Sequence, residues 1–187
     1  MNARNGVKEV LFFSVKNEIK AYLLYLESAK IAEKEGFKNV AKLFRATAEA
    51  ELIHAKRFFR LYSNRDMTED DLKEIMNQIN IDVGSTKENL TIAIKNEDYE
   101  NKELYVNFSK KALSANNVGA FILWNQTALV EGIHRDSFKK ALEYVSMGRD
   151  IPINEIFLCP VCGYVALGNA PFKCPICDEP GKNFRKF

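Results

Sequence analysis

The chain has 187 residues, of which 47% are hydrophobic, so it can bury a sizeable core and is not expected to be disordered. Its 27 Lys and Arg residues nearly balance 25 Asp and Glu residues, and the net charge of +2 argues against nucleic acid or an anionic membrane as a partner. The apolar run at residues 10–13 is too short and too closely flanked by charges for a signal peptide or a membrane span, so we expect a cytoplasmic protein.

Apolar residues recur at helical spacing through most of the chain before residue 150. The pattern predicts four long helices and a short helix, capped by Thr68, inside the connection between the second and the third. The third helix is expected to be capped by Ser85 or Thr86. The expected ranges are 7–34, 38–62, 68–79, 86–112 and 116–147. Four amphipathic helices with one crossover are typical of the ferritin-like four-helix bundle.

The tail has a different composition. Residues 155–187 are rich in Pro, Gly and Cys and show no helical period. A segment of fewer than about 40 residues rarely folds without a metal or a crosslink. We therefore expect a mainly α protein with two domains, a bundle at residues 1–150 and a small metal-knuckle domain at residues 151–187.

The only two histidines of the chain close the same motif, Glu51-x-x-His54 and Glu131-x-x-His134. Residues three apart lie on one face of a helix, so each motif presents a carboxylate beside an imidazole. Bundles that hold two metal ions take a Glu from each of two helices and a Glu-x-x-His from each of two others. The repeated motif therefore predicts two walls of a dimetal site.

Glutamates on the other two helices supply the remaining carboxylates. Glu18 lies on the apolar stripe of the first helix, and Glu97 and Glu100 are three apart on the third. Taken singly each could be a solvated residue, but together the set has the spacing of a dimetal site. Two divalent cations would neutralise much of the buried charge; oxygen and imidazole ligands suit iron or manganese, and zinc is chemically possible. Tyr25 and Tyr105 are expected in the core, with hydroxyls bonded to ligand carboxylates.

The four cysteines form two Cys-x-x-Cys pairs, Cys159 with Cys162 and Cys174 with Cys177. In a chain without a secretion signal this favours a metal site over two disulfides. Four thiolates give a tetrahedral site for iron or zinc, and the ligands alone do not distinguish a redox iron from a structural zinc.

The segments NEIKAYLLY, AEAELIHAKRFF, ENLTIAIKNEDYENKELY and ALVEGIHRDSF, followed by CPVCGY and CPIC, resemble the rubrerythrin family over almost the whole chain. The resemblance implies a non-haem di-iron centre, oxo-bridged when oxidised, and a rubredoxin-like iron at the four cysteines. It implies that Glu51 and Glu131 bridge the irons and that Glu18 and Glu97 bind terminally. It further implies that His134 completes the second iron, while Glu100 and His54 exchange at the first as the redox state changes. The ligand set it implies is Glu18, Glu51, His54, Glu97, Glu100, Glu131 and His134.

Four positions depart from the family pattern. Asn17 and Asn96 stand where the family often has Gly before a ligand Glu. Gly132 lies inside an expected helix, where glycine costs about 1 kcal/mol relative to alanine, and we expect it to admit a neighbouring side chain. Asp178 replaces the small residue often found after the last Cys of rubredoxin-like domains. None of these changes removes a ligand.

The two sites together lead us to expect a peroxidase that reduces hydrogen peroxide to water, with electrons delivered through the cysteine-bound iron. No Gly-x-Gly-x-x-Gly fingerprint is present, so a separate NAD(P)H-dependent reductase or a rubredoxin is expected as electron donor. Because the donor domain in the family often serves a partner subunit, a homodimer or higher homo-oligomer is expected. The alternatives are a ferroxidase that uses dioxygen, and a non-enzymatic electron carrier with a structural zinc.

Overall fold

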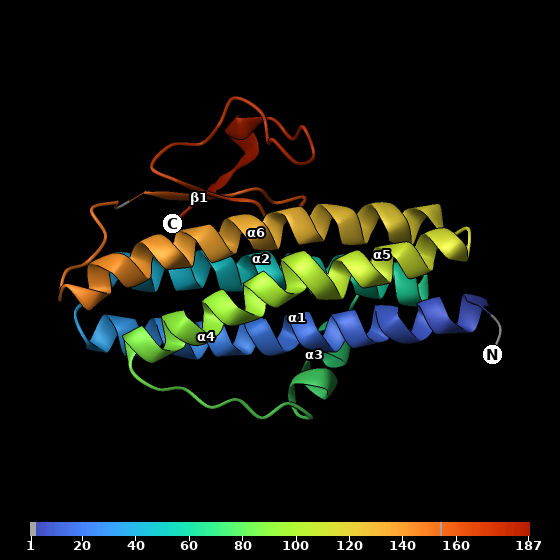
Figure 1. The fold of residues 1–187 in the computed structure, drawn as a ribbon, viewed down its shortest axis with the longest axis horizontal. Coiled ribbons are helices and arrows are strands. Elements are labelled where there is room, and N and C mark those ends of the chain that lie inside the picture. The colour runs from blue at the N-terminus through green and yellow to red at the C-terminus, as the bar shows by residue number, and fades with distance from the viewer. Residues whose placement is uncertain (1–2, 154) are drawn as a thin grey trace.

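The computed structural model describes residues 3–153 and 155–187 and has four long helical segments packed as a ferritin-like bundle (Figure 1). The third segment consists of α4, a π-helical turn η1 and α5. The bounds are α1 Ala3–Lys34, α2 Lys38–Ser63, α3 Glu69–Met76, α4 Thr86–Tyr99, η1 Glu100–Leu104, α5 Tyr105–Ser114 and α6 Val118–Ser146. The mainly α bundle predicted from apolar spacing is therefore confirmed. No helix within the described ranges is long and apolar enough to cross a membrane.

The crossover carries the short helix α3, as expected. Thr68 accepts a hydrogen bond from the Asp71 backbone N–H, and the Asp71 side chain accepts one from the Thr68 backbone, which completes a capping box. The helix ends at Met76 rather than Ile79, because the last residues form turns with N–H groups bonded three residues back. Ser85, not Thr86, caps α4 and forms a second capping box with Glu88.

The expectation of one continuous third helix through Ala112 was wrong. Residues Glu100–Leu104 form a π-helical turn, in which the Tyr105 backbone N–H bonds to the carbonyl of Glu100. The side chain of Asn101 donates to the carbonyl of Ala128 on α6, at 2.7 Å. Such a turn inserts one extra residue into the helix, and apolar spacing alone does not reveal it. Glu100 is the first residue of this turn.

The apolar core divides into two clusters along the bundle. On α1 one cluster reaches Ile19 and the other begins at Ala21; on α2 the change falls between Ala50 and Ala55, and on α6 between Ala128 and Phe138. Glu51 and His54 fall in the gap on α2, Glu131 and His134 in the gap on α6, and Glu18 lies directly before Ile19 on α1. The fold thus provides a buried polar layer between two apolar halves.

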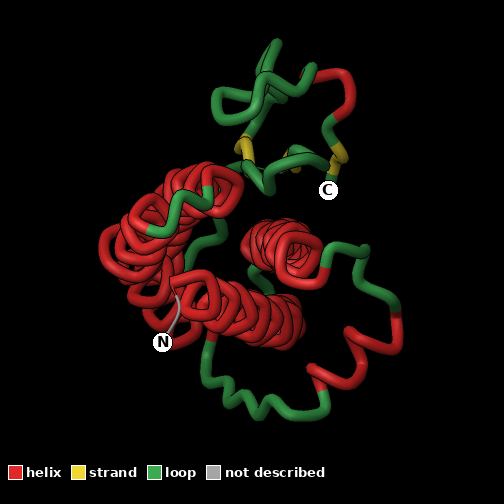
Figure 2. Tube along the Cα trace, turned by 90° about the vertical axis from the view of Figure 1, so that its right-hand side faces the viewer, coloured by secondary structure: helices red, strands yellow, loops and turns green. Residues whose placement is uncertain are grey.

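The tail forms a three-stranded antiparallel sheet in the order β2-β1-β3. Its strands are β1 Ile156–Leu158, β2 Val165–Leu167 and β3 Arg185–Lys186, with a 3₁₀ turn η2 at Gly181–Asn183. Figures 1 and 2 place this sheet and its loops on one side of the bundle and the crossover on the opposite side. Apolar side chains of the sheet, including Ile156 and Leu158, join the bundle core. The small domain is therefore packed against α2 and α6 of its own chain.

Candidate metal centres

Seven side chains from all four helical segments meet in the polar layer, and each is at most 6% exposed. Six of them form two overlapping groups of potential ligands, and within each group the donor atoms lie within 4.8 Å of one another. We call these the His54 group and the His134 group. The His54 group is Glu18, Glu51, His54 and Glu131; the His134 group is Glu51, Glu97, Glu131 and His134.

Glu51 and Glu131 belong to both groups, and each points one oxygen at each histidine. His54 Nδ1 lies 2.9 Å from Glu51 Oε2 and 3.0 Å from Glu131 Oε1. His134 Nδ1 lies 3.1 Å from Glu51 Oε1 and 2.9 Å from Glu131 Oε2. Two ligands bound about 2.1 Å from one octahedral ion lie about 3 Å apart, so these spacings suit ligand pairs on a metal. The two carboxylates have the geometry of bridges between two ions.

The outer nitrogen of each imidazole is held by a backbone carbonyl of the small domain. His54 Nε2 lies 2.9 Å from the carbonyl oxygen of Cys162, and His134 Nε2 lies 3.0 Å from that of Gly163. A carbonyl only accepts hydrogen bonds, so each Nε2 carries the proton. In the neutral tautomer each Nδ1 then directs its lone pair at the carboxylates, as a metal ligand requires.

Charges in this layer are balanced by protons when no metal is bound. Burial alone would lower the pKa of His134, yet the charge of Glu51 and the hydrogen bonds that the protonated ring donates to Glu131 and Glu51 raise it to about 9. Burial would raise the pKa of Glu51, but the charge of His134 and hydrogen bonds from both histidines bring it down to about 2. Burial and neighbouring carboxylates raise the pKa of Glu18 and of Glu97 well above the ordinary value.

These residues fit divalent metal ions. When the histidines are neutral and protonated only at Nε2, several buried polar atoms that face the centre have no hydrogen-bond partner among the described residues, although buried polar groups normally find partners. They are Glu18 Oε2, Glu51 Oε1, Glu97 Oε2, Glu131 Oε1 and Oε2, and His134 Nδ1. Two cations would satisfy these atoms and take over the positive charge that protonated histidines otherwise supply.

Glu100 is placed differently from the other glutamates. It is buried beside the centre but belongs to neither group. Its Oε1 accepts a hydrogen bond of 2.8 Å from Asn17 Nδ2 on α1. Burial, and then the charge of Glu18, raise the pKa of Glu100 well above its ordinary value.

Tyr25 and Tyr105 are buried in the core, and each hydroxyl donates to a carboxylate of the centre. Tyr25 bonds to Glu97 Oε1 at 2.6 Å, and Tyr105 forms a very short bond to Glu18 Oε1. Burial, reinforced by the nearby carboxylates, raises the pKa of both tyrosines well above the ordinary value, so both hydroxyls keep their protons.

The four cysteines form a second group of potential ligands. All are free thiols, which excludes the two-disulfide alternative in this structure. Cys159 Sγ lies 3.6 Å from Cys177 Sγ, and Cys162 Sγ lies 3.5 Å from Cys174 Sγ. Sulfurs bound about 2.3 Å from one tetrahedral ion lie nearly 3.8 Å apart, so the spacing suits one iron or zinc. Backbone amides and the neighbouring thiol of Cys162 lower the pKa of Cys159 to about 5, which favours its metal-binding thiolate form.

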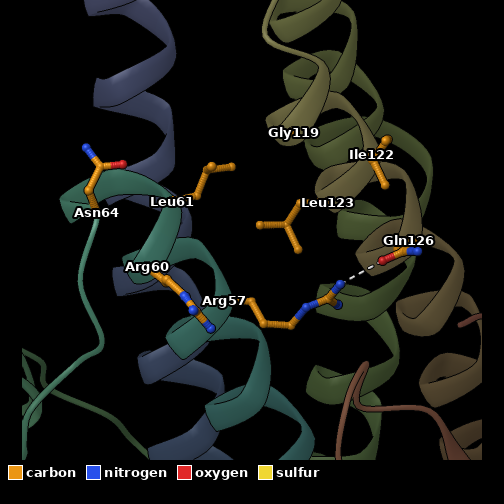
Figure 3. Close-up of a pocket in the computed structure, with 8 residues that line it drawn as sticks. All are labelled: Arg57, Arg60, Leu61, Asn64, Gly119, Ile122, Leu123 and Gln126. Carbon is orange, nitrogen blue, oxygen red and sulfur yellow. Dashed lines mark hydrogen bonds between the residues drawn. The ribbon is translucent and has the colours of Figure 1, made fainter. Parts of the chain in front are cut away.

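Arg57 on α2 is a half-buried cation close to the cysteine group. Burial lowers its pKa, and the charges of Cys162, Cys177 and Cys159 oppose that effect. Figure 3 shows its guanidinium extending across a surface pocket of about 540 Å³ to Gln126 on α6, where Nη2 donates to Oε1 at 2.6 Å. Arg57 Nη1 is buried without a hydrogen-bond partner in the described part of the chain.

The sequence pointed to the candidate ligands that the structure brings together and to Tyr25 and Tyr105, but it did not point to Asn17, Arg57 or Gly163 as residues that contact them or their neighbours. Asn17 was noted only as a departure from the family, and Arg57 was not singled out. Gly163 has φ +81°, and a Cβ there would lie 2.5 Å from His54 Nε2; its place directly after a Cys-x-x-Cys pair was the available signal. For Gly132 the expectation was confirmed, because its missing Cβ leaves room for the side chain of Asn101.

Comparison with known proteins agrees with this geometry. Residues 9–142 match the rubrerythrin family model, and residues 157–185 match the rubrerythrin rubredoxin-like domain. A putative rubrerythrin of Methanocaldococcus jannaschii is 33% identical over 187 residues, covering 91% of each chain. Nigerythrin of Nitratidesulfovibrio vulgaris is 30% identical over 181 residues, covering 96% of this chain and 85% of that protein.

Solved structures of nigerythrin share the fold of this chain. Nigerythrin in its mixed-valence state superposes with a TM-score of 0.84 at 29% identity, covering 97% of this chain and 86% of that chain. Nigerythrin in its fully reduced, all-ferrous state superposes equally well, at 28% identity. With both segments matched by family models and the fold shared along nearly its whole length, the chain belongs to the rubrerythrin family and ends in a rubredoxin-like domain.

Proposed function

We propose that the protein is a non-haem di-iron peroxidase that reduces hydrogen peroxide to water with electrons delivered through an iron held by the four cysteines. The observation that carries the proposal is a direct hydrogen bond between the dimetal centre of the bundle and the four-cysteine group: His54 donates to the carbonyl of Cys162 itself. A storage protein or a structural zinc module has no need of such a link.

The ligand roles follow the two groups. Glu51 and Glu131, which belong to both groups, would hold both irons; Glu18 with His54 would complete one position, and Glu97 with His134 the other. Glu100 would be the seventh ligand and would exchange with His54 at the first position, as the family resemblance implies. The all-ferrous nigerythrin structure supports iron in a protein with this fold. Two ferrous ions held by these residues would supply the redox chemistry, one electron each, for the two-electron reduction of peroxide.

The protein side chains hold the protons that the reaction consumes. Reducing one hydrogen peroxide takes two electrons and two protons and yields two waters. Tyr105 holds a proton against Glu18 Oε1, and Tyr25 holds one against Glu97 Oε1. Both hydroxyls are buried beside the ligand carboxylates, so they are placed to donate protons without bulk water entering the layer.

The electron route runs along the backbone of the first knuckle. From Cys162 it passes through that residue's own carbonyl to the N–H of His54, and from Gly163 in the same way to His134. Val130, one residue before a bridging glutamate, packs against the cysteine group and excludes water from the junction. A separate NAD(P)H-dependent reductase or a rubredoxin reduces the cysteine iron, in a cytoplasmic homodimer or higher homo-oligomer.

Two measurements test the proposal. Stopped-flow oxidation of the fully reduced protein is expected to be much faster with hydrogen peroxide than with dioxygen; the reverse order would instead support a ferroxidase. Metal analysis of the purified protein is expected to give about three irons per chain, with a visible spectrum of cysteine-bound ferric iron. Zinc at the cysteines would contradict the internal electron route.

A further inference from the structure

Glu100 is the only glutamate of the seven-residue layer that lies outside both metal-binding groups. It is nevertheless buried, and it is the first residue of the π-helical turn η1. A buried carboxylate that binds no metal needs another donor. The donor here is a single side chain, Asn17.

Asn17 contacts Glu100 directly and Glu18 through the Tyr105 hydroxyl. Its Nδ2 donates to Glu100 Oε1 at 2.8 Å and lies 3.3 Å from the Tyr105 hydroxyl. That hydroxyl donates its proton to Glu18, so it accepts from Asn17. One amide therefore binds Glu100 directly and supports Glu18, a member of the His54 group, through Tyr105.

Asn96, which holds the equivalent position before Glu97, differs from Asn17 in its hydrogen bonding. Asn96 precedes Glu97 as Asn17 precedes Glu18, and it is half-buried as well. Unlike Asn17, it makes no side-chain hydrogen bond within residues 3–153 and 155–187. An asparagine before a ligand glutamate therefore does not by itself reach the centre, whereas Asn17 does.

We infer that Asn17 is a positioning residue that holds the Glu100 carboxylate away from the His54 group and so leaves that metal position to His54. The inference rests on the proposed di-iron function, because it concerns which side chain binds one of its irons. Glu100 has to give up the Asn17 hydrogen bond to become a ligand. A hydrogen bond to a charged group is strong enough that its loss shifts the ratio of His54-bound to Glu100-bound protein by about tenfold or more.

The test compares N17A, N96A and the unchanged protein, each loaded with ⁵⁷Fe and fully reduced without oxygen. Anaerobic crystal structures give the occupancy of His54 and Glu100 on the first iron, and Mössbauer spectra report the same change in solution. We expect His54 as the ligand in the unchanged protein and in N96A, and a ratio of Glu100-bound to His54-bound iron raised about tenfold or more in N17A. Circular dichroism and iron content identify folded, loaded samples.

Two results would overturn the inference: N17A with the same ligands as the unchanged protein, or Glu100 already bound to reduced iron while Asn17 is present. Peroxide turnover is measured separately, so the two proposals fail independently. A ligand change in N17A together with slow peroxide reduction leaves the role of Asn17 standing and removes the peroxidase assignment. Fast peroxide reduction with unchanged ligands in N17A leaves the peroxidase assignment standing and removes the role of Asn17.

Discussion

Gly163 and His54 meet where the small domain contacts the bundle, and there is no space between them for a side chain. A Cβ on Gly163 would lie 2.5 Å from His54 Nε2 and 3.3 Å from the Cβ of Ala50. The same segment supplies the carbonyls that bind both histidines. The dimetal centre of the bundle and the four-cysteine group can therefore approach this closely only because Gly163 has no side chain.

Replacing Gly163 with alanine is expected to separate the two domains locally. The positive φ of +81° costs roughly 1–2 kcal/mol for alanine, and the clash with His54 adds to it. The substitution removes no ligand from the bundle centre or from the four-cysteine group, so the variant should bind about as much iron as the unchanged protein. Turnover that depends on the reductase should fall at least about tenfold, since the carbonyl hydrogen bonds to the histidines are lost.

Gly168→Ala is the matched control. Gly168 also has a positive φ, of +91°, but nothing lies within 4 Å of its Cβ position. It should show the loss of stability that the positive φ causes, without the additional clash and without the loss of turnover. Equal turnover in the two variants would mean that the contact between Gly163 and His54 does not serve electron delivery.

The ligand side chains could be predicted from the sequence because their signal is local. Glu51 with His54 and Glu131 with His134 are three apart on one helix, and Glu18 is a charge on an apolar stripe. The contacts that orient them are not local. Asn17 reaches Glu100 across 83 positions of sequence, and His54 reaches Cys162 across 108. A backbone carbonyl carries no residue signature, so no pattern in the sequence marks it.

The same distinction explains the error in the third helix. The apolar positions of α4 and α5 fit one helical period well enough to suggest a continuous helix. The π turn is accompanied by contacts with α6 that the apolar pattern does not reveal: Asn101 donates to the Ala128 carbonyl, and its side chain fills the space beside Gly132. The side-chain pattern was enough to predict that a helix is present in the third segment. Whether that helix is interrupted by a π turn depends on how it packs against α6.

Metal removal is expected to make stability depend on pH in the neutral to alkaline range. The folded-state pKa of His134 is about 9, above the ordinary 6.5, so its stabilisation is complete below pH 6.5 and is lost as the pH rises through 9. The pKa of Glu51 is lowered from 4.5 to about 2, so its stabilisation is present above pH 4.5 and is lost as the pH falls through 2.

Calorimetry of the chelator-treated protein should therefore show a melting temperature that falls between pH 6.5 and 9. Glu18, Glu97 and Glu100 act in the same direction, because their raised pKa values also make ionisation at high pH unfavourable. The iron-loaded protein should show no such fall, since metal replaces the protons. A flat profile for the metal-free protein would contradict the charge balance described for this layer.

Cys174→Ser is expected to remove the cysteine-bound iron while leaving the bundle loaded. Cys174 is buried, and its sulfur lies 3.5 Å from that of Cys162, so serine weakens a soft tetrahedral site. Iron content should fall from about three to about two per chain, and the visible bands of cysteine-bound ferric iron should disappear. Reductase-dependent turnover should be abolished, while a single oxidation of the chemically reduced bundle by peroxide persists; unchanged turnover would refute the electron route.

Gly132 and Asn101 are expected to be energetically coupled. Alanine at position 132 gains about 1 kcal/mol of helix propensity, but its Cβ would lie 3.0 Å from Asn101 Nδ2. Asn101 is not free to move, because it donates to the Ala128 carbonyl and accepts from Arg135 Nη1 at 2.9 Å. Chemical denaturation of G132A, N101A and the double variant measures the coupling. Alanine at 132 should be more favourable by about 1 kcal/mol when residue 101 is also alanine, because the clash is then absent. Additive effects would mean that the glycine does not serve to admit Asn101, and that the π turn is held by other contacts.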